Sequence, residues 1–118
     1  MPIAKYAGFS LDSDNPQALA DFYVRLLGAE VSYTSEEFVY LKEPSLGFVK
    51  VDKHVPPTWP DSDVPKQAHL ELSVENLDAA ETAIVELGAT KPDFQPQPDR
   101  WRVLLDPAGH PFCISVMS

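Results

Sequence analysis

Few residues of this 118-residue chain could do chemistry: three histidines, His54, His69 and His110, and a single cysteine, Cys113. His69 and Glu71 have the most suggestive spacing, because a strand places residues two apart on the same side. An imidazole beside a carboxylate could act as a general base or bind a ligand, or a hydrogen bond could simply hold it in place. Cys113 alone cannot form an internal disulfide or a thiolate zinc site, and a free cysteine packs like a small hydrophobe.

The elements that would position these residues occur twice along the chain, in the same order. In each half an alternating strand precedes a helix with apolar residues at helical spacing. The two predicted pairs are Gly8 to Asp12 with Pro16 to Leu27, and His69 to Ser73 with Leu77 to Leu87. Both helices end in Leu-Gly-Ala, where Gly28 and Gly88 can adopt backbone angles that stop a helix at no Cβ penalty. The chain therefore contains an internal repeat.

Short strands are predicted after each helix. They cover residues 30–34, 37–42 and 47–52 in the first half, and 90–95, 101–106 and 112–117 in the second. Three prolines in and after residues 90–95 restrict that strand to a sheet edge. The sequence thus predicts one domain, residues 1–118, built from two βαβββ modules at about 1–52 and 67–118. The proline-rich residues 53–66 are predicted to form a stiff surface connection.

Composition narrows the possible partners. The net charge is −9 and the pI is about 4.5, so a nucleic-acid backbone would be repelled. No apolar run approaches the roughly 20 residues that cross a bilayer, and the first residues lack the pattern of a signal peptide. We therefore expect a cytoplasmic protein with neither a nucleic-acid nor a membrane partner.

Three motifs, in this order, carry a family resemblance. They are Ala20-Asp21-Phe22-Tyr23 through Leu27-Gly28, His69-Leu70-Glu71-Leu72 with Leu77-Asp78-Ala79-Ala80, and Asp106-Pro107-Ala108-Gly109-His110-Pro111-Phe112. Together they resemble the glyoxalase, bleomycin-resistance and extradiol-dioxygenase superfamily, the vicinal oxygen chelate proteins, and in particular its short glyoxalase-like domains. The resemblance implies an α+β fold with a curved mixed sheet, whose helices cover one face and whose concave face forms a pocket.

Strand alternation assigns side chains to that pocket. If Leu70 and Leu72 pack under a helix, His69 and Glu71 face the concavity. On the last strand, Cys113, Ser115 and Met117 face the same way, and only one of Trp101 and Arg102 can do so. The predicted ligand-binding residues are His69, Glu71, Cys113, Trp101, Tyr40 and Phe48, the last three as aromatic walls.

A catalytic metal is not expected. In metal-dependent relatives four strands each supply one ligand, and these positions fall here on Gly8 or Ala7, Val49 or Lys50, His69, and Cys113. Only His69 and Cys113 carry side chains suited to coordination, whereas a catalytic zinc or iron site needs three or more protein ligands. The resemblance therefore predicts no metal and no other cofactor.

Three functions remain open. The preferred hypothesis is a metal-free pocket that binds a small organic molecule. The second is a lyase or isomerase of the same fold with His69 as general base, and the third is a protein-interaction module whose cleft is filled by side chains. Relatives often build pockets at two-fold interfaces, so the sequence leaves monomer and homodimer open.

Overall fold

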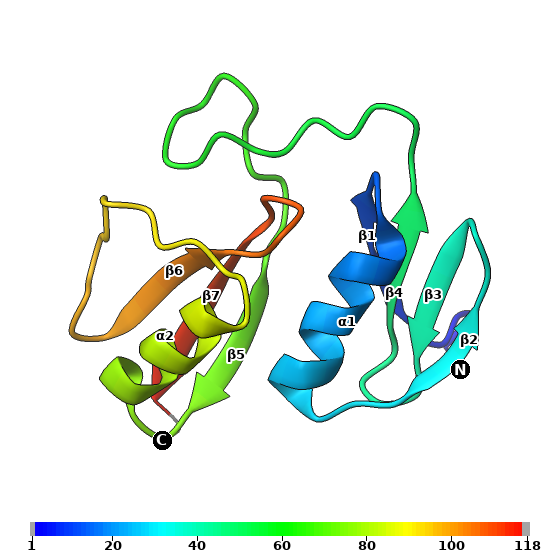
Figure 1. The fold of residues 1–118 in the computed structure, drawn as a ribbon, viewed down its shortest axis with the longest axis horizontal. Coiled ribbons are helices and arrows are strands. Elements are labelled where there is room, and N and C mark those ends of the chain that lie inside the picture. Colours follow the sequence, from blue (N-terminus) through cyan, green and yellow to red (C-terminus); the bar gives the residue numbers. More distant parts are fainter. Residues whose placement is uncertain (1, 117–118) are drawn as a thin grey trace. The chain divides into compact units, whose positions relative to one another are not determined.

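The computed structural model describes residues 2–116 and divides into two compact units, one ending at His54 and the other beginning at Val55 (Figure 1). Each unit contains one helix on one face of a small mixed sheet. The predicted α+β class and the helix-and-strand repeat are confirmed. Neither helix within the described residues is long and apolar enough to cross a membrane.

The first unit is a four-stranded sheet with one helix. Its elements are β1 (Phe9–Ser13), α1 (Pro16–Leu27), β2 (Val31–Thr34), β3 (Phe38–Leu41) and β4 (Leu46–Lys50). The strand order is β1-β4-β3-β2, in which β1 runs parallel to β4 and the other neighbours are antiparallel. A parallel pair requires a crossover, which α1 and the two following strands provide.

Local signals set the ends of α1. The Asn15 side chain accepts a hydrogen bond of 3.1 Å from the Ala18 N–H, and Pro16 occupies the first turn. Gly28 ends the helix with a φ of 65°, which is left-handed backbone. The inner face of α1 packs on the sheet, where the Tyr23 ring stacks on Phe48 at a centroid distance of 5.4 Å.

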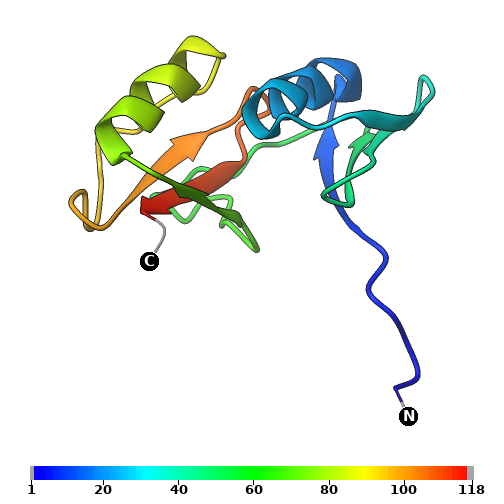
Figure 2. The same cartoon turned by 90° about the horizontal axis from the view of Figure 1, so that it is seen from below.

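The second unit repeats this plan with one strand fewer in its described part. Its elements are β5 (Leu70–Val74), α2 (Leu77–Glu86), β6 (Trp101–Leu105) and β7 (Pro111–Val116), and the strand order is β5-β7-β6. The strand β5 runs parallel to β7, and β6 is antiparallel to it. The helix α2 lies on one side of these strands (Figure 2), and Phe112 and Ile114 on that side are fully buried.

The prediction of a strand at residues 90–95 is wrong. Only Thr90 pairs with β6, through a single bridge to Leu105. Farther along that edge, a side chain replaces the backbone: the Gln95 amide donates to the Val103 carbonyl at 2.9 Å and accepts from the Val103 N–H at 2.8 Å. Pro92 and Pro96 have no N–H with which to continue a ladder, so the edge of β6 is completed by a glutamine side chain.

The segment before β5 is packed against its own unit. Pro56 lies against Gly109 in the β6–β7 turn, where an added Cβ would stand 2.6 Å from the proline Cβ. Gly109 also has a φ of 87°, so both the backbone and the close approach require glycine. The turn itself is held by Asp106, whose carboxylate accepts hydrogen bonds from the Ala108 and His110 N–H groups at 2.9 and 3.0 Å.

Candidate functional site

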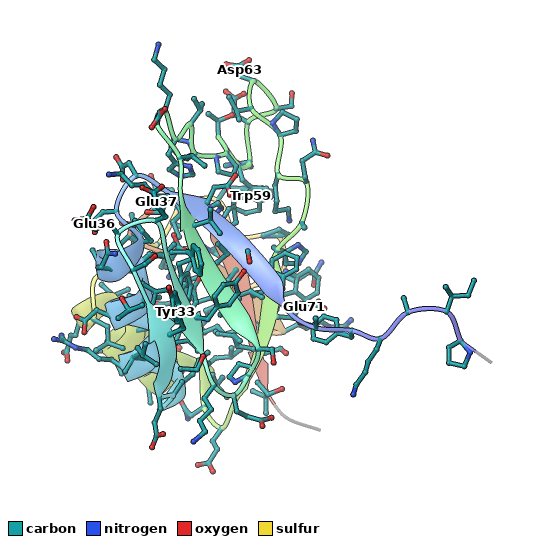
Figure 3. The ribbon with its side chains drawn as sticks, turned by 90° about the vertical axis from the view of Figure 1, so that its right-hand side faces the viewer. Tyr33, Glu36, Glu37, Trp59, Asp63 and Glu71 are labelled. Carbon is teal, nitrogen blue, oxygen red and sulfur yellow. The ribbon has the colours of Figure 1, made fainter. Side chains whose placement is uncertain are left out.

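The face of the second sheet that points away from α2 carries a hollow of about 460 Å³. It draws on all three strands and on the loops beside them. Its lining is Lys66, His69 and Glu71 from β5 and the chain before it, Trp101 and Val103 from β6, Cys113 and Ser115 from β7, with Trp59 and Pro96. Two of these residues, Trp59 and Glu71, are marked in Figure 3.

Strand register brings the lining residues onto one face. Cys113 is the register partner of Glu71 on one side and of Val103 on the other, and Ser115 is the partner of Trp101. Partners across neighbouring strands project to the same face of a sheet. Alternation therefore places these side chains on one face of the three strands, and that face carries the hollow.

Arg102 takes the opposite face to Trp101. Its guanidinium lies 2.7 Å from a carboxylate oxygen of Asp78 and 3.3 Å from one of Glu81, both on α2. The Arg102 side chain is only 14% exposed, and its hydrogen bond to Asp78 raises its pKa further. Trp101 is thus the member of the pair that faces the hollow.

His69 and Glu71 are both exposed in the hollow. Neither side chain makes a hydrogen bond or an ion pair with any residue between positions 2 and 116. Among the described residues the histidine is therefore not held by Glu71, and a ligand-binding role for it stays a prediction. Its imidazole nitrogens are available to a ligand.

Trp59 and Lys66 enter the hollow from the segment before β5. Thr58 closes the intervening loop, since its N–H donates to the Val64 carbonyl at 2.8 Å and its hydroxyl accepts from the Val64 N–H at 2.9 Å. The Trp59 ring packs on Phe94 at 5.8 Å, and the Lys66 ammonium lies over the Trp59 ring, also at 5.8 Å. This distance is within the range of a cation–π contact.

Cys113 is a half-buried thiol in the hollow. Burial raises its pKa, the nearby Lys66 ammonium lowers it, and the Glu71 carboxylate raises it; the net pKa is above the ordinary value. A raised pKa keeps the thiol protonated near neutral pH, and the protonated form is a poor nucleophile. Cys113 thus contributes a small, weakly polar surface.

The other two predicted wall residues, Tyr40 and Phe48, belong to the first unit. Phe48 is 0% exposed and packs against Tyr23, so it is a core residue and does not wall an open cleft. Tyr40 is exposed on the face opposite α1, where its ring lies over Gly47 and meets Phe38 edge to face. Gly47 and Phe48 are neighbours in β4 and must point to opposite faces.

The donor set does not fit a catalytic metal. His69 and Cys113 are the only two possible ligands at the four positions inferred from the family. Among residues 2–116, no three His, Cys, Asp or Glu side chains are grouped so that they could hold a metal ion. A metal-free site stays a prediction. Met117, which was expected to face the pocket, lies outside the described residues.

Lys66, Trp59 and Pro96 are lining residues that sequence patterns do not reveal. They come from irregular segments, in which no periodicity assigns a side chain to a face. Proline-rich composition suggests a surface connection and does not show which of its residues return to the sheet. Ser115 and Val103 do follow from alternation, because they lie two residues after Cys113 and Trp101.

Several solved structures share the fold of this chain. A glyoxalase/bleomycin resistance protein/dioxygenase family enzyme from Burkholderia phytofirmans PsJN is 18% identical, with a TM-score of 0.69 over 97% of this chain and 100% of that chain. A fosfomycin resistance protein from Mesorhizobium loti is 12% identical, with a TM-score of 0.71 over 99% and 95%. The bleomycin-binding protein of Streptomyces verticillus is 16% identical, with a TM-score of 0.62 over 98% and 100%.

The fold is therefore that of the vicinal oxygen chelate superfamily. Within it, the model of the glyoxalase-like domain matches residues 8–115, and the chain belongs to this family. A comparison with curated proteins finds no match.

Proposed function

We propose that this protein binds a small organic molecule in the hollow of its second unit, without a catalytic metal. The observation that carries the proposal is the composition of the hollow: two tryptophans beside Lys66, His69 and Glu71, whose charged or polar ends have no ion-pair partner in the described chain. Small-molecule sites combine apolar walls with a few placed polar groups, in volumes of roughly 300–1,000 Å³. The hollow, at about 460 Å³, lies in that range.

The family supports the same class of function. One relative of this fold is named for binding bleomycin and another for fosfomycin resistance. Their sequence identity to this chain is low, so they support small-molecule binding as a class and do not indicate which molecule is bound.

Binding is better supported than turnover. A general base is commonly oriented by a second group, and His69 has no such partner among the described side chains. Cys113, with its raised pKa, is not poised as a nucleophile. An interaction module with a filled cleft is less well supported, because the hollow is open.

The proposal can be tested through the tryptophans. The chain has two tryptophans, Trp59 and Trp101, and both line the hollow. A ¹⁵N-labelled sample therefore gives two indole N–H signals, which Trp59→Phe assigns, and a library of small organic molecules is screened for compounds that shift them. We expect a ligand that moves both signals.

His69 distinguishes binding from a structural role. His69→Gln should leave the melting temperature within a few degrees of the wild-type value, because no hydrogen bond is lost. The same substitution should weaken ligand binding by about 1–3 kcal/mol. The control is His54→Gln, since His54 is a histidine outside the hollow. A loss of ten degrees or more with unchanged affinity would contradict the proposal, as would a library that leaves both indole signals in place.

A further inference from the structure

Lys66 differs from the other basic residues of this acidic chain in combining partial burial with the lack of a carboxylate partner in the described residues. The chain has 18 acidic and 9 basic side chains, so carboxylates are in twofold excess over basic groups. Four of them do so within the described residues, namely Arg25, Lys42, Lys91 and Arg102. The remaining unpaired cations other than Lys66 are all exposed: Lys5, Lys50, Lys53 and Arg100. Lys66 alone is both half-buried and without a carboxylate partner in that part of the chain.

An unpaired ammonium in a hollow is unfavourable unless something compensates its lost hydration. The Trp59 ring compensates in part, because its face attracts a cation. Glu71 lines the same hollow but forms no ion pair with Lys66. The ammonium therefore keeps donors that an anion entering the hollow could accept.

The other residues of the hollow indicate which chemical groups a ligand would carry besides an anion. Trp59 and Trp101 offer flat apolar surface, which suits a planar ring. An ionised Glu71 can only accept hydrogen bonds, so it suits a hydroxyl or amine on the ligand. A single ammonium matches a singly charged carboxylate, whereas a dianionic phosphate would bring excess negative charge close to Glu71.

We propose that the ligand of the hollow is an aromatic acid, with its carboxylate on Lys66, its ring against the tryptophans and a hydrogen-bond donor toward Glu71. This inference rests on the proposed function and gives it a substrate class. The net charge of −9 opposes any anion at long range. A preference for the acid over its neutral analogue would therefore have to come from a local positive group.

Three compounds of matched shape test the inference: 2-naphthoate, 2-naphthamide and 2-(aminomethyl)naphthalene. Each is titrated against the two indole N–H signals. We expect the acid to bind about tenfold more tightly than the amide, as a charge-assisted hydrogen bond would give, and the amine to bind most weakly. With 6-hydroxy-2-naphthoate, the added hydroxyl should tighten binding a fewfold further, and Glu71→Gln should reduce that gain.

Variants of Lys66 assign the effect. Lys66→Gln should abolish the preference for the acid, Lys66→Arg should retain it, and Lys53→Gln should change nothing because Lys53 is an exposed lysine of the first unit. Equal binding of acid and amide, tighter binding of the amine, or a preference that survives Lys66→Gln would overturn the aromatic-acid inference alone. If none of the three compounds shifts the indole signals, the inference is likewise wrong, and the proposed function fails with it only when the wider library also yields no ligand.

Discussion

The Gln95 side chain, although only half-buried, should contribute substantially to the free energy of unfolding of the second unit. It makes two hydrogen bonds to the backbone of Val103, a residue only 2% exposed, in the place where a strand would otherwise pair with β6. Gln95→Ala removes both partners and leaves the Val103 N–H and carbonyl unsatisfied. It also removes a hydrogen bond of 3.0 Å from the Gln95 amide to the carbonyl of the half-buried Pro92, which can accept from water instead. Each neutral hydrogen bond contributes about 1 kcal/mol, and water entering from the hollow would recover part of the desolvation penalty, so we expect a loss of about 2 kcal/mol.

This loss is large enough to measure by thermal unfolding. Unfolding entropy is about 2.1 cal/mol/K per residue, so in a chain of this length 2 kcal/mol corresponds to a fall of about 8 °C in the melting temperature. The matched control is Gln97→Ala, two residues away, because the Gln97 side chain is exposed and makes no hydrogen bond within the described residues. We expect that control to stay within about 0.5 kcal/mol of the wild type.

A second variant tests the hydrogen-bond geometry. In Gln95→Glu an ionised carboxylate can accept from the Val103 N–H but cannot donate to the Val103 carbonyl, whereas a protonated one can do both. Folding should therefore raise the pKa of the introduced carboxyl above its unfolded value of about 4.3. The stability that it contributes is fully present below that value and is lost as pH rises through the folded-state pKa, so the deficit against the wild type should shrink in acid. If Gln95→Ala behaves like Gln97→Ala, the account of the β6 edge is refuted.

Three further outcomes are expected. Asp106→Ala should lower the free energy of unfolding in urea by about 3 kcal/mol, because Asp106 is only 3% exposed and its carboxylate accepts hydrogen bonds from two turn N–H groups. Asp106→Asn should lower it clearly less, and equal losses for the two variants would contradict this role of the carboxylate. Cys113 should react with iodoacetamide more slowly than a free cysteine peptide at pH 8, because its thiol pKa is raised. Lys66→Gln should slow the reaction further, since Lys66 lowers the thiol pKa. A rate equal to that of the peptide would be inconsistent with the raised pKa. The purified protein should retain no stoichiometric zinc, nickel, manganese or ferrous ion, and a chelator should leave its melting temperature unchanged. Tight one-to-one metal binding that His69→Ala abolishes would overturn the prediction of a metal-free site.

Local signals explain why the helices could be predicted. The first helix begins and ends where Asn15, Pro16 and Gly28 indicate, because capping and positive φ depend only on neighbouring residues. The second begins after Asn76, whose side chain accepts from the Ala79 N–H at 2.8 Å. Gly88 also has positive φ, 122°, although Leu87 is the residue that caps α2.

The segment after α2 shows where local reasoning fails. Residues 90–95 include Thr90 and Phe94, types that favour strands, next to prolines that cannot donate to a ladder. The conflict is resolved by a contact eight residues apart in the sequence, between Gln95 and Val103. No local propensity predicts that a side-chain amide will replace backbone pairing.

The sequence by itself determined which side of β5 and of β7 faces the hollow, but it left the choice between Trp101 and Arg102 in β6 open. Alternation has a period of two in any extended strand, so His69 and Glu71 had to share a face, and Cys113 had to project opposite to Phe112. Tertiary structure decided that this face is a hollow and that Trp59 and Lys66 help to line it. The physical reason is that their positions depend on closure of the loop between Thr58 and Val64 and on contacts of Pro56 with Gly109 and of Trp59 with Phe94, all between residues that no sequence period connects.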